Sequence, residues 1–184
     1  MTLGFRPHGV GAPAPPLELP DATGRQRSLA EFRGKPVMVS FLGPAHCAFC
    51  RAHVIRAIEA RDELTRVGAD VILVAFHDPE LLMAKMMHDL DLPYTLLLDP
   101  EMAAYRRWGL GQAGLGSLLR PGLYWAGLKV ALSRQPSMGK SPDPGQLGGD
   151  FVVDREGRLR LVNRMKSFHD RAAMPRLVDA LATA

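Results

Sequence analysis

The chain has 184 residues, of which 47% are hydrophobic and 23% charged, and this composition is typical of a globular protein with a sizeable core. The formal net charge is +4 and the basic residues are scattered, so we expect no nucleic-acid binding. The most apolar stretch, 109–132, is interrupted by Arg120, Pro121 and Lys129, so we also expect no membrane-spanning helix. Disordered, fibrous and membrane classes are thereby disfavoured.

Residues 1–16 are rich in proline and glycine and predict an irregular lead-in. They do not contain a charged segment followed by a continuous apolar run, so we expect no secretory signal and a cytoplasmic location. Residues 17–184 show no internal repeat and predict a single domain. A reducing compartment disfavours structural disulfides, which makes two closely spaced cysteines more typical of a redox or metal site.

The first half of this domain alternates strand and helix patterns. A short strand is expected to start at Leu17, and a short helical piece to be capped near Ser28. Two apolar runs, 37–42 and 69–76, predict buried strands of the kind found in parallel sheets. Between them, apolar residues spaced by four predict a helix that begins at Cys47 and ends before Gly68.

The same alternation continues to the end of the chain. Asp78–Pro79 and Asp99–Pro100 are each expected to open a helix, with a strand at 94–99 between them. Residues 150–163 predict an antiparallel hairpin, and about 170–182 a final helix. Together these elements predict a three-layer α/β domain whose central sheet is flanked by helices.

Both cysteines stand in the stretch "GPAHCAFCRAH", between a buried strand and a helix. A thiol at the first turn of a helix faces unpaired N–H groups and the positive end of the helix dipole, which favours the thiolate. His46 and Arg51 can add positive charge. We therefore expect Cys47 to be the more exposed and more acidic sulfur, which attacks, and Cys50 to resolve the product.

The order of strand, CxxC, helix, two further βα units, hairpin and helix resembles the thioredoxin-like superfamily. "DPEMAAYRRWGL" and "QLGGDFVVDREGRLRLVNRMKSFHD" are similar to the peroxiredoxin-like branch of the AhpC/TSA proteins. The resemblance implies a mixed central sheet and a thiol-dependent peroxidase or related disulfide oxidoreductase, with Cys47 and Cys50 as its redox pair. It also implies a peroxide or disulfide substrate and a thiol reductant, such as thioredoxin or a low-molecular-weight thiol, and no cofactor.

Three other interpretations stay open at this point. The pair could serve a protein-disulfide reductase, or stand in a thioredoxin-fold module that only binds other proteins. His46, Cys47, Cys50 and His53 are all zinc-ligand types, but four ligands within eight residues at a helix start are sterically awkward. We therefore expect no metal at this site.

Two positions depart from the family pattern. Typical peroxiredoxins carry Pro-x-x-x-Thr/Ser-x-x-Cys, whereas Ser40 and Pro44 stand seven and three residues before Cys47. Thioredoxins place a cis-proline, and typical peroxiredoxins an arginine, just before the strand equivalent to "FVVD". This chain has Gly148 there.

The stretch at about 109–149 reads as an insertion into the fold. In a helix at about 121–133, Leu123, Leu128 and Leu132 would supply an apolar face, with Tyr124 and Trp125 as wider amphipathic contacts. We expect it to pack against the protein's own sheet. The alternative is a lid over the cysteine pair or a homodimer contact.

Overall fold

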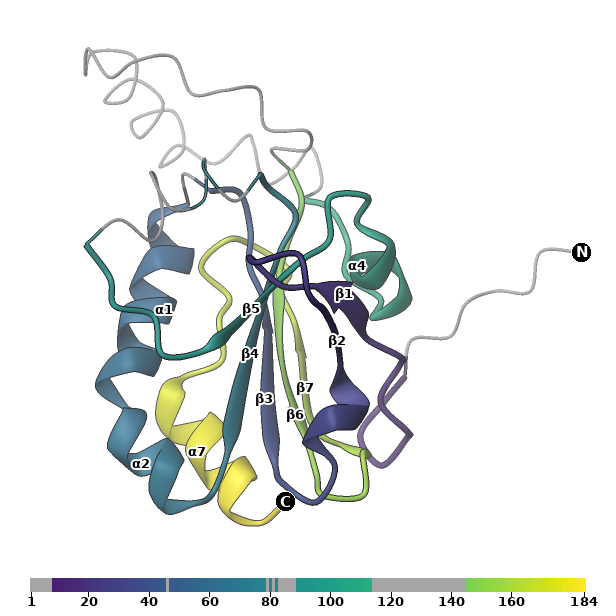
Figure 1. The fold of residues 1–184 in the computed structure, drawn as a ribbon, viewed down its shortest axis with the longest axis vertical. Helices are drawn as coiled ribbons and strands as arrows, with labels where there is room; N and C mark the ends of the chain where they lie inside the picture. The colour runs from purple at the N-terminus through teal and green to yellow at the C-terminus, as the bar shows by residue number, and fades with distance from the viewer. Residues whose placement is uncertain (1–7, 46, 79, 81, 83–88, 114–144) are drawn as a thin grey trace, which may run out of the picture.

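The computed structural model describes the chain except for residues 1–7, 46, 79, 81, 83–88 and 114–144. A five-stranded sheet in the order β5-β4-β3-β6-β7 forms its centre (Figure 1). Neighbouring strands β3, β4 and β5 run parallel, while β6 and β7 are antiparallel, so the sheet is mixed. The strands are β3 (Val37–Phe41), β4 (Asp70–Ala75), β5 (Thr95–Leu98), β6 (Gly149–Val153) and β7 (Leu159–Arg164).

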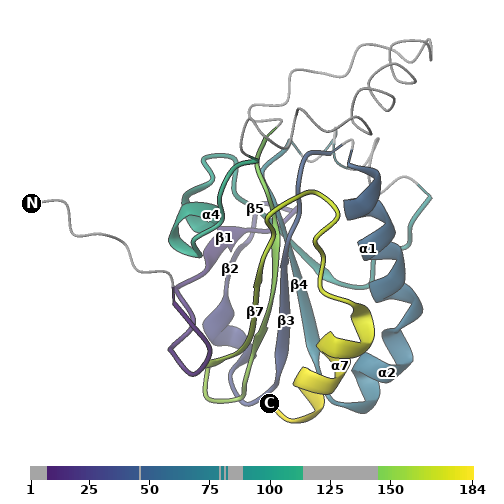
Figure 2. The ribbon, with the colours of Figure 1, turned by 180° about the vertical axis from the view of Figure 1, so that it is seen from behind.

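Helices cover both faces of this sheet (Figures 1 and 2). On one face lie α1 (Ala48–Glu59), α2 (Arg61–Arg66) and α7 (Met174–Ala182). On the other lie α4 (Ala103–Arg107), the 3-10 helix η1 (Leu29–Phe32) and a small hairpin of β1 (Glu18–Pro20) and β2 (Gln26–Ser28). The expected three-layer thioredoxin-like architecture is confirmed. None of the described helices is long and apolar enough to cross a membrane.

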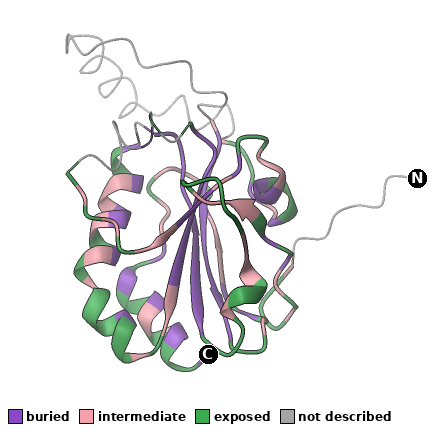
Figure 3. Cartoon of the chain, viewed as in Figure 1, coloured by how far each residue is buried: buried purple, intermediate pink, exposed green. Residues whose placement is uncertain are grey.

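The central strands are buried because both of their faces carry a core (Figure 3). Every residue of β3 and β6 is buried. Side chains alternate along β3, so Val39 and Phe41 join the core beneath α4, while Met38 joins the core beneath α1 and α7. Ser40 has the same parity as Met38 and therefore faces α1.

Three helix boundaries differ from the expectation. The helix after Cys47 breaks at Ala60 into α1 and α2. The α4 helix starts at Ala103 rather than directly after Asp99, because Asp99 caps it from a distance by accepting the N–H groups of Ala103, Ala104 and Tyr105. The final helix starts only at Met174, since the preceding residues form a loop. The helices expected after Asp78 and at 121–133 fall largely or wholly outside the described residues.

The described parts of the N-terminal lead-in and of the insertion at about 109–149 form backbone hydrogen bonds that fix their positions. Gly11 and Ala14 donate backbone hydrogen bonds to Leu159 and Gly157 of the β6–β7 hairpin region. The chain segments at the start and end of the insertion lie next to each other, because the N–H of Ala113 donates to Gly145 O and the N–H of Leu147 donates to Gly111 O. Both ends of the insertion are therefore fixed side by side.

Candidate active site

The cysteine pair lies at the carboxyl end of β3, where a tight loop leads into α1. Cys47 is the N-cap residue of α1, and Cys50 lies in its first turn. In an open α/β sheet this edge is the usual position of a functional site. The expected placement of both cysteines at the start of one helix is confirmed.

Cys50 is fully buried and surrounded by hydrogen-bond donors. Its Sγ accepts the backbone N–H of Gly43 at 3.3 Å and lies 3.5 Å from a terminal nitrogen of Arg171. A thiolate at this position would therefore have a backbone donor and a guanidinium charge as neighbours, which is the environment that stabilises a sulfur anion.

Cys47 lies closer to the surface, with 8% of its area exposed, against 0% for Cys50. Its Sγ accepts the backbone N–H of Cys50 at 3.3 Å and so caps α1. The two side chains also share a hydrogen bond. Both are free thiols. Cys47 is the more exposed sulfur, as expected.

The order of acidity is the reverse of the expectation. The hydrogen bond from Cys47, the charge of Arg171 and the N–H of Gly43 together hold the pKa of Cys50 well below its ordinary value. The pKa of Cys47 is raised, because its proton is shared with Cys50, its side chain is buried and the ionised Cys50 lies beside it. Being nearer the surface does not make Cys47 the thiolate, since the donors converge on Cys50.

A residue that the sequence analysis did not name brings a positive charge to Cys50. His46 lies outside the described residues. Arg51 is half-buried in the first turn of α1, and its backbone N–H donates to Cys47 O. The cation whose guanidinium reaches Cys50 is Arg171, from the loop between β7 and α7.

Gly148 leaves the space that this guanidinium occupies. A Cβ atom at Gly148 would lie 2.1 Å from the Phe41 carbonyl oxygen and 2.9 Å from the Arg171 terminal nitrogen. The sequence position that holds arginine in typical peroxiredoxins is thus a glycine, and an arginine from a distant loop reaches the same place.

Arg171 is held by a buried polar cluster that the sequence analysis missed. One terminal nitrogen donates to Asp150 Oδ1 at 2.8 Å, and the other donates to Phe41 O at 2.9 Å. Ser40 Oγ donates to the same Asp150 oxygen at 2.7 Å, and His53 Nε2 lies 3.2 Å from it. Burial opposes the ionisation of Asp150, yet Arg171, His53 and Ser40 together keep its pKa below the usual range.

One signal of this cluster was present in the sequence. Ser40 and Asp150 are polar residues in two otherwise apolar strands, and the sheet register places them directly opposite each other. Arg171 carried no comparable signal, because it lies in a loop remote in sequence from both cysteines.

His53 faces this cluster. Its Nε2 lies 3.1 Å from Ser40 Oγ and close to Asp150. Within the described part of the chain, no group of three or more His, Cys, Asp or Glu side chains is arranged to hold a metal ion.

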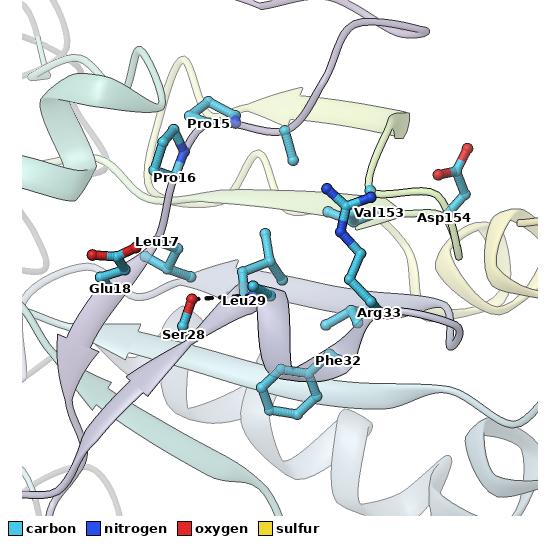
Figure 4. A pocket seen from close by; sticks show the side chains of 14 residues that line it. Pro15, Pro16, Leu17, Glu18, Ser28, Leu29, Phe32, Arg33, Val153 and Asp154 are labelled. Carbon is cyan, nitrogen blue, oxygen red and sulfur yellow. Dashed lines mark hydrogen bonds between the residues drawn. The ribbon is translucent and has the colours of Figure 1, made fainter.

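A pocket of about 180 Å³ lies at the other end of β3, among residues of the N-terminal segment, η1 and the β6–β7 hairpin (Figure 4). Val37, the first residue of β3, and Val153, the last of β6, line it. The cysteines follow the opposite end of β3, so this pocket is separate from the cysteine site.

Comparison with known proteins identifies the family. The AhpC/TSA family model matches residues 10–162. The chain is 32% identical over 108 residues to the chloroplastic peroxiredoxin Q of Gentiana triflora, covering 59% of this chain and 49% of that one. It is 32% identical over 106 residues to peroxiredoxin Bcp of Escherichia coli K12, covering 58% and 67%. The chain thus spans about half the length of the first of these relatives.

The fold comparison agrees. The crystal structure of peroxidoxin BcpB from Mycobacterium tuberculosis matches with a TM-score of 0.68 at 19% identity, covering 95% of this chain and 96% of that one. The fold is therefore the thioredoxin-like fold of peroxiredoxins. Because the family model matches most of the sequence, this chain belongs to the AhpC/TSA family.

The family motif can also be counted from Cys50. Seven and three residues before Cys50 stand Gly43 and Cys47, at the positions of the motif's proline and its Thr or Ser. The hydroxyl expected at the second position is replaced by the Cys47 thiol, which accepts the Cys50 N–H. Neither count places the motif's proline and its Thr or Ser, so the motif does not by itself assign the attacking role to Cys47 or to Cys50.

Proposed function

We propose that this protein is a thiol peroxidase in which Cys50 attacks the peroxide and Cys47 resolves the product. The observation that carries the proposal is the set of donors on Cys50 Sγ, namely the N–H of Gly43 and the guanidinium of Arg171. A nucleophilic cysteine must be a thiolate, and these donors favour the thiolate at Cys50. Membership of the AhpC/TSA family supports the same chemistry.

The reaction proceeds in two chemical steps. The Cys50 thiolate attacks one peroxide oxygen, the O–O bond breaks, Cys50 becomes a sulfenic acid, and the leaving oxygen departs as an alcohol or water after taking a proton. Cys47 then attacks the Cys50 sulfur, the S–O bond breaks, and a water molecule and a Cys47–Cys50 disulfide form. An external dithiol, or two molecules of a monothiol, then supplies two electrons that restore both thiols, and the reductant is left as a disulfide.

The partners follow from this chemistry. We propose a small peroxide as substrate, because Cys50 is fully buried and bulky oxidants would reach Cys47 first. The reductant is a thiol, either thioredoxin or a low-molecular-weight thiol. The cytoplasmic location stays a prediction from the sequence.

Single-cysteine variants test the assignment of roles. After one equivalent of hydrogen peroxide, Cys47→Ser should accumulate a sulfenic acid that dimedone traps, because Cys50 reacts and has no resolving partner. Cys50→Ser should not be labelled at a comparable rate. The wild-type protein should form an intramolecular disulfide, seen as a loss of two hydrogens by mass spectrometry.

Two results would contradict this proposal. If dimedone labelled Cys50→Ser rapidly and did not label Cys47→Ser, Cys47 would be the attacking cysteine. A wild-type protein that stays a dithiol under mild excess peroxide would exclude the peroxidase function.

One observation favours a second candidate, a protein-disulfide reductase. Of the two sulfurs, only Cys47 has exposed area, so a protein disulfide would meet Cys47 first. In that case Cys50→Ser should trap a mixed disulfide on Cys47 with a model disulfide substrate, faster than either variant reacts with peroxide. The interpretation as a thioredoxin-fold module that only binds other proteins requires that neither thiol reacts at neutral pH.

A further inference from the structure

A buried group of polar side chains lies behind Arg171, and the two chemical steps above do not use it. Asp150 is 0% exposed and His53 is 1% exposed. Burial of this kind is costly unless each polar group is paired. The pairing that the structure shows therefore points to a role in holding one particular arrangement.

The Asp150 carboxylate is fixed from several elements at once. Its Oδ1 accepts from Ser40 on β3 and from Arg171, with His53 of α1 beside it. Its Oδ2 accepts the N–H of Ala172 at 3.0 Å. The carboxylate thus connects β3, β6, α1 and the loop before α7.

Arg171 is in turn fixed at both ends of its fork. One terminal nitrogen is bound by Asp150, and the other lies against Phe41 O and Cys50 Sγ. Because the guanidinium is planar and hydrogen-bonded at both terminal nitrogens, it cannot rotate away from Cys50 Sγ without breaking its bond to Asp150 or to Phe41 O.

We propose that Asp150 is a positioning residue that holds the Arg171 guanidinium against Cys50, with Ser40 and His53 keeping the carboxylate in place. This rests on the proposed function, in which Cys50 reacts as a thiolate. Among the described residues, Asp150 forms hydrogen bonds with Ser40, Arg171 and Ala172 and lies beside His53, but it forms none with either sulfur, so its effect on Cys50 passes through Arg171.

The alternative, in which Asp150 acts only through its own charge, predicts the opposite sign. A carboxylate near a thiolate opposes ionisation of the thiol, so removing its charge alone would make Cys50 more acidic. If Asp150 holds Arg171 in place, removing it frees the guanidinium and makes Cys50 less acidic. The direction of the change separates the two roles.

The test is a titration of Cys50 by its thiolate ultraviolet absorbance in the Cys47→Ser background, where Cys50 is the one cysteine of the chain. This parent retains Arg171 beside Cys50, Asp150 and His53 behind Arg171, and the buried Tyr105. Asp150→Asn should raise the thiol pKa by about one pH unit or more. Asp99→Asn, which removes a buried carboxylate that caps α4, should leave it unchanged.

A double variant isolates the route. Arg171→Gln should raise the pKa by itself, and adding Asp150→Asn to it should bring no further rise, because there is no guanidinium left to position. An unchanged or lowered pKa in Asp150→Asn, or an equal rise in the Arg171→Gln background, would overturn the proposal.

A conservative variant covers the case in which Asp150→Asn fails to fold. Ser40→Ala removes one hydrogen bond from Asp150 and leaves both charges in place, so a smaller rise in the thiol pKa is expected. An unchanged pKa in Ser40→Ala would then overturn the proposal. The titration uses no peroxide, so failure of the peroxidase assay would not be mistaken for failure of this inference.

Discussion

Gly148 shows how a single residue without a side chain can decide the chemistry of a site. The backbone of β3 and the tip of Arg171 both approach its Cα more closely than a Cβ would allow. Typical peroxiredoxins have an arginine at this position. A glycine at position 148 does not indicate which other residue brings a guanidinium to the site. The replacement comes from Arg171, which no local pattern in the sequence connects with the cysteines.

Substitution of Gly148 should therefore be costly. Gly148→Ala would force a Cβ against the Phe41 carbonyl and the Arg171 guanidinium, and we expect a loss of roughly 1–3 kcal/mol in unfolding free energy. The thiol pKa of Cys50 should rise at the same time, because the guanidinium is displaced. Urea unfolding and thiolate absorbance measure the two effects.

Gly111→Ala is the matched control, since a Cβ there would meet no atom within 4 Å. Equal unfolding free energies for Gly148→Ala and Gly111→Ala would show that the protein accommodates a Cβ at residue 148 without loss of stability.

At the scale of elements, the sequence predicted most of what local patterns determine. Buried apolar runs located β3, β4 and β5, and the hairpin of β6 and β7 followed from its turn residues. Helix starts were predicted less well, because capping depends on side-chain geometry: Asp99 caps α4 from outside the helix rather than from the N-cap position. The cysteine pair was found from its spacing, whereas Asp150 and Arg171 meet it only through the tertiary fold.

The start of α1 depends on a sulfur in place of the usual oxygen. In a Cys50→Ser background, Cys47→Ala should lower the unfolding free energy by about 1 kcal/mol relative to Cys47→Ser, because alanine has no acceptor for the N–H of residue 50. Urea unfolding of the two double variants gives the comparison. Equal stability of the two double variants would mean that a side-chain acceptor at position 47 adds nothing to the stability of the helix.

For the whole molecule, a buried thiolate makes stability depend on pH. In the reduced wild-type protein, the folded state has a lower Cys50 pKa than the unfolded state, whose value is about 8.5. We expect the same direction in Cys47→Ser, because the Gly43 N–H and the Arg171 guanidinium still lie beside Cys50. Between these two values the unfolded chain binds more protons, so the free energy of unfolding rises with pH. This contribution is complete above the unfolded pKa and is lost as the pH falls through the folded pKa.

We expect the stability of reduced Cys47→Ser to increase by roughly 1 kcal/mol per pH unit across the neutral range, relative to the Cys47→Ser/Cys50→Ser control. Urea unfolding at several pH values under reducing conditions measures the difference. Parallel pH profiles for the two proteins would show that Cys50 has the same pKa folded and unfolded.

The distance along the chain between Cys50 and Arg171 has a consequence for biosynthesis. Arg171 follows Cys50 by 121 residues, so a ribosome completes both cysteines long before it adds the guanidinium that lies against Cys50. A nascent chain therefore carries two ordinary thiols, which react slowly with oxidants while the protein is unfolded. Under the proposed function, we expect the Cys50 thiolate to be favoured only after the strand bearing Asp150 and the loop bearing Arg171 have been made and folded, so the unfinished chain should react with oxidants more slowly than the folded protein.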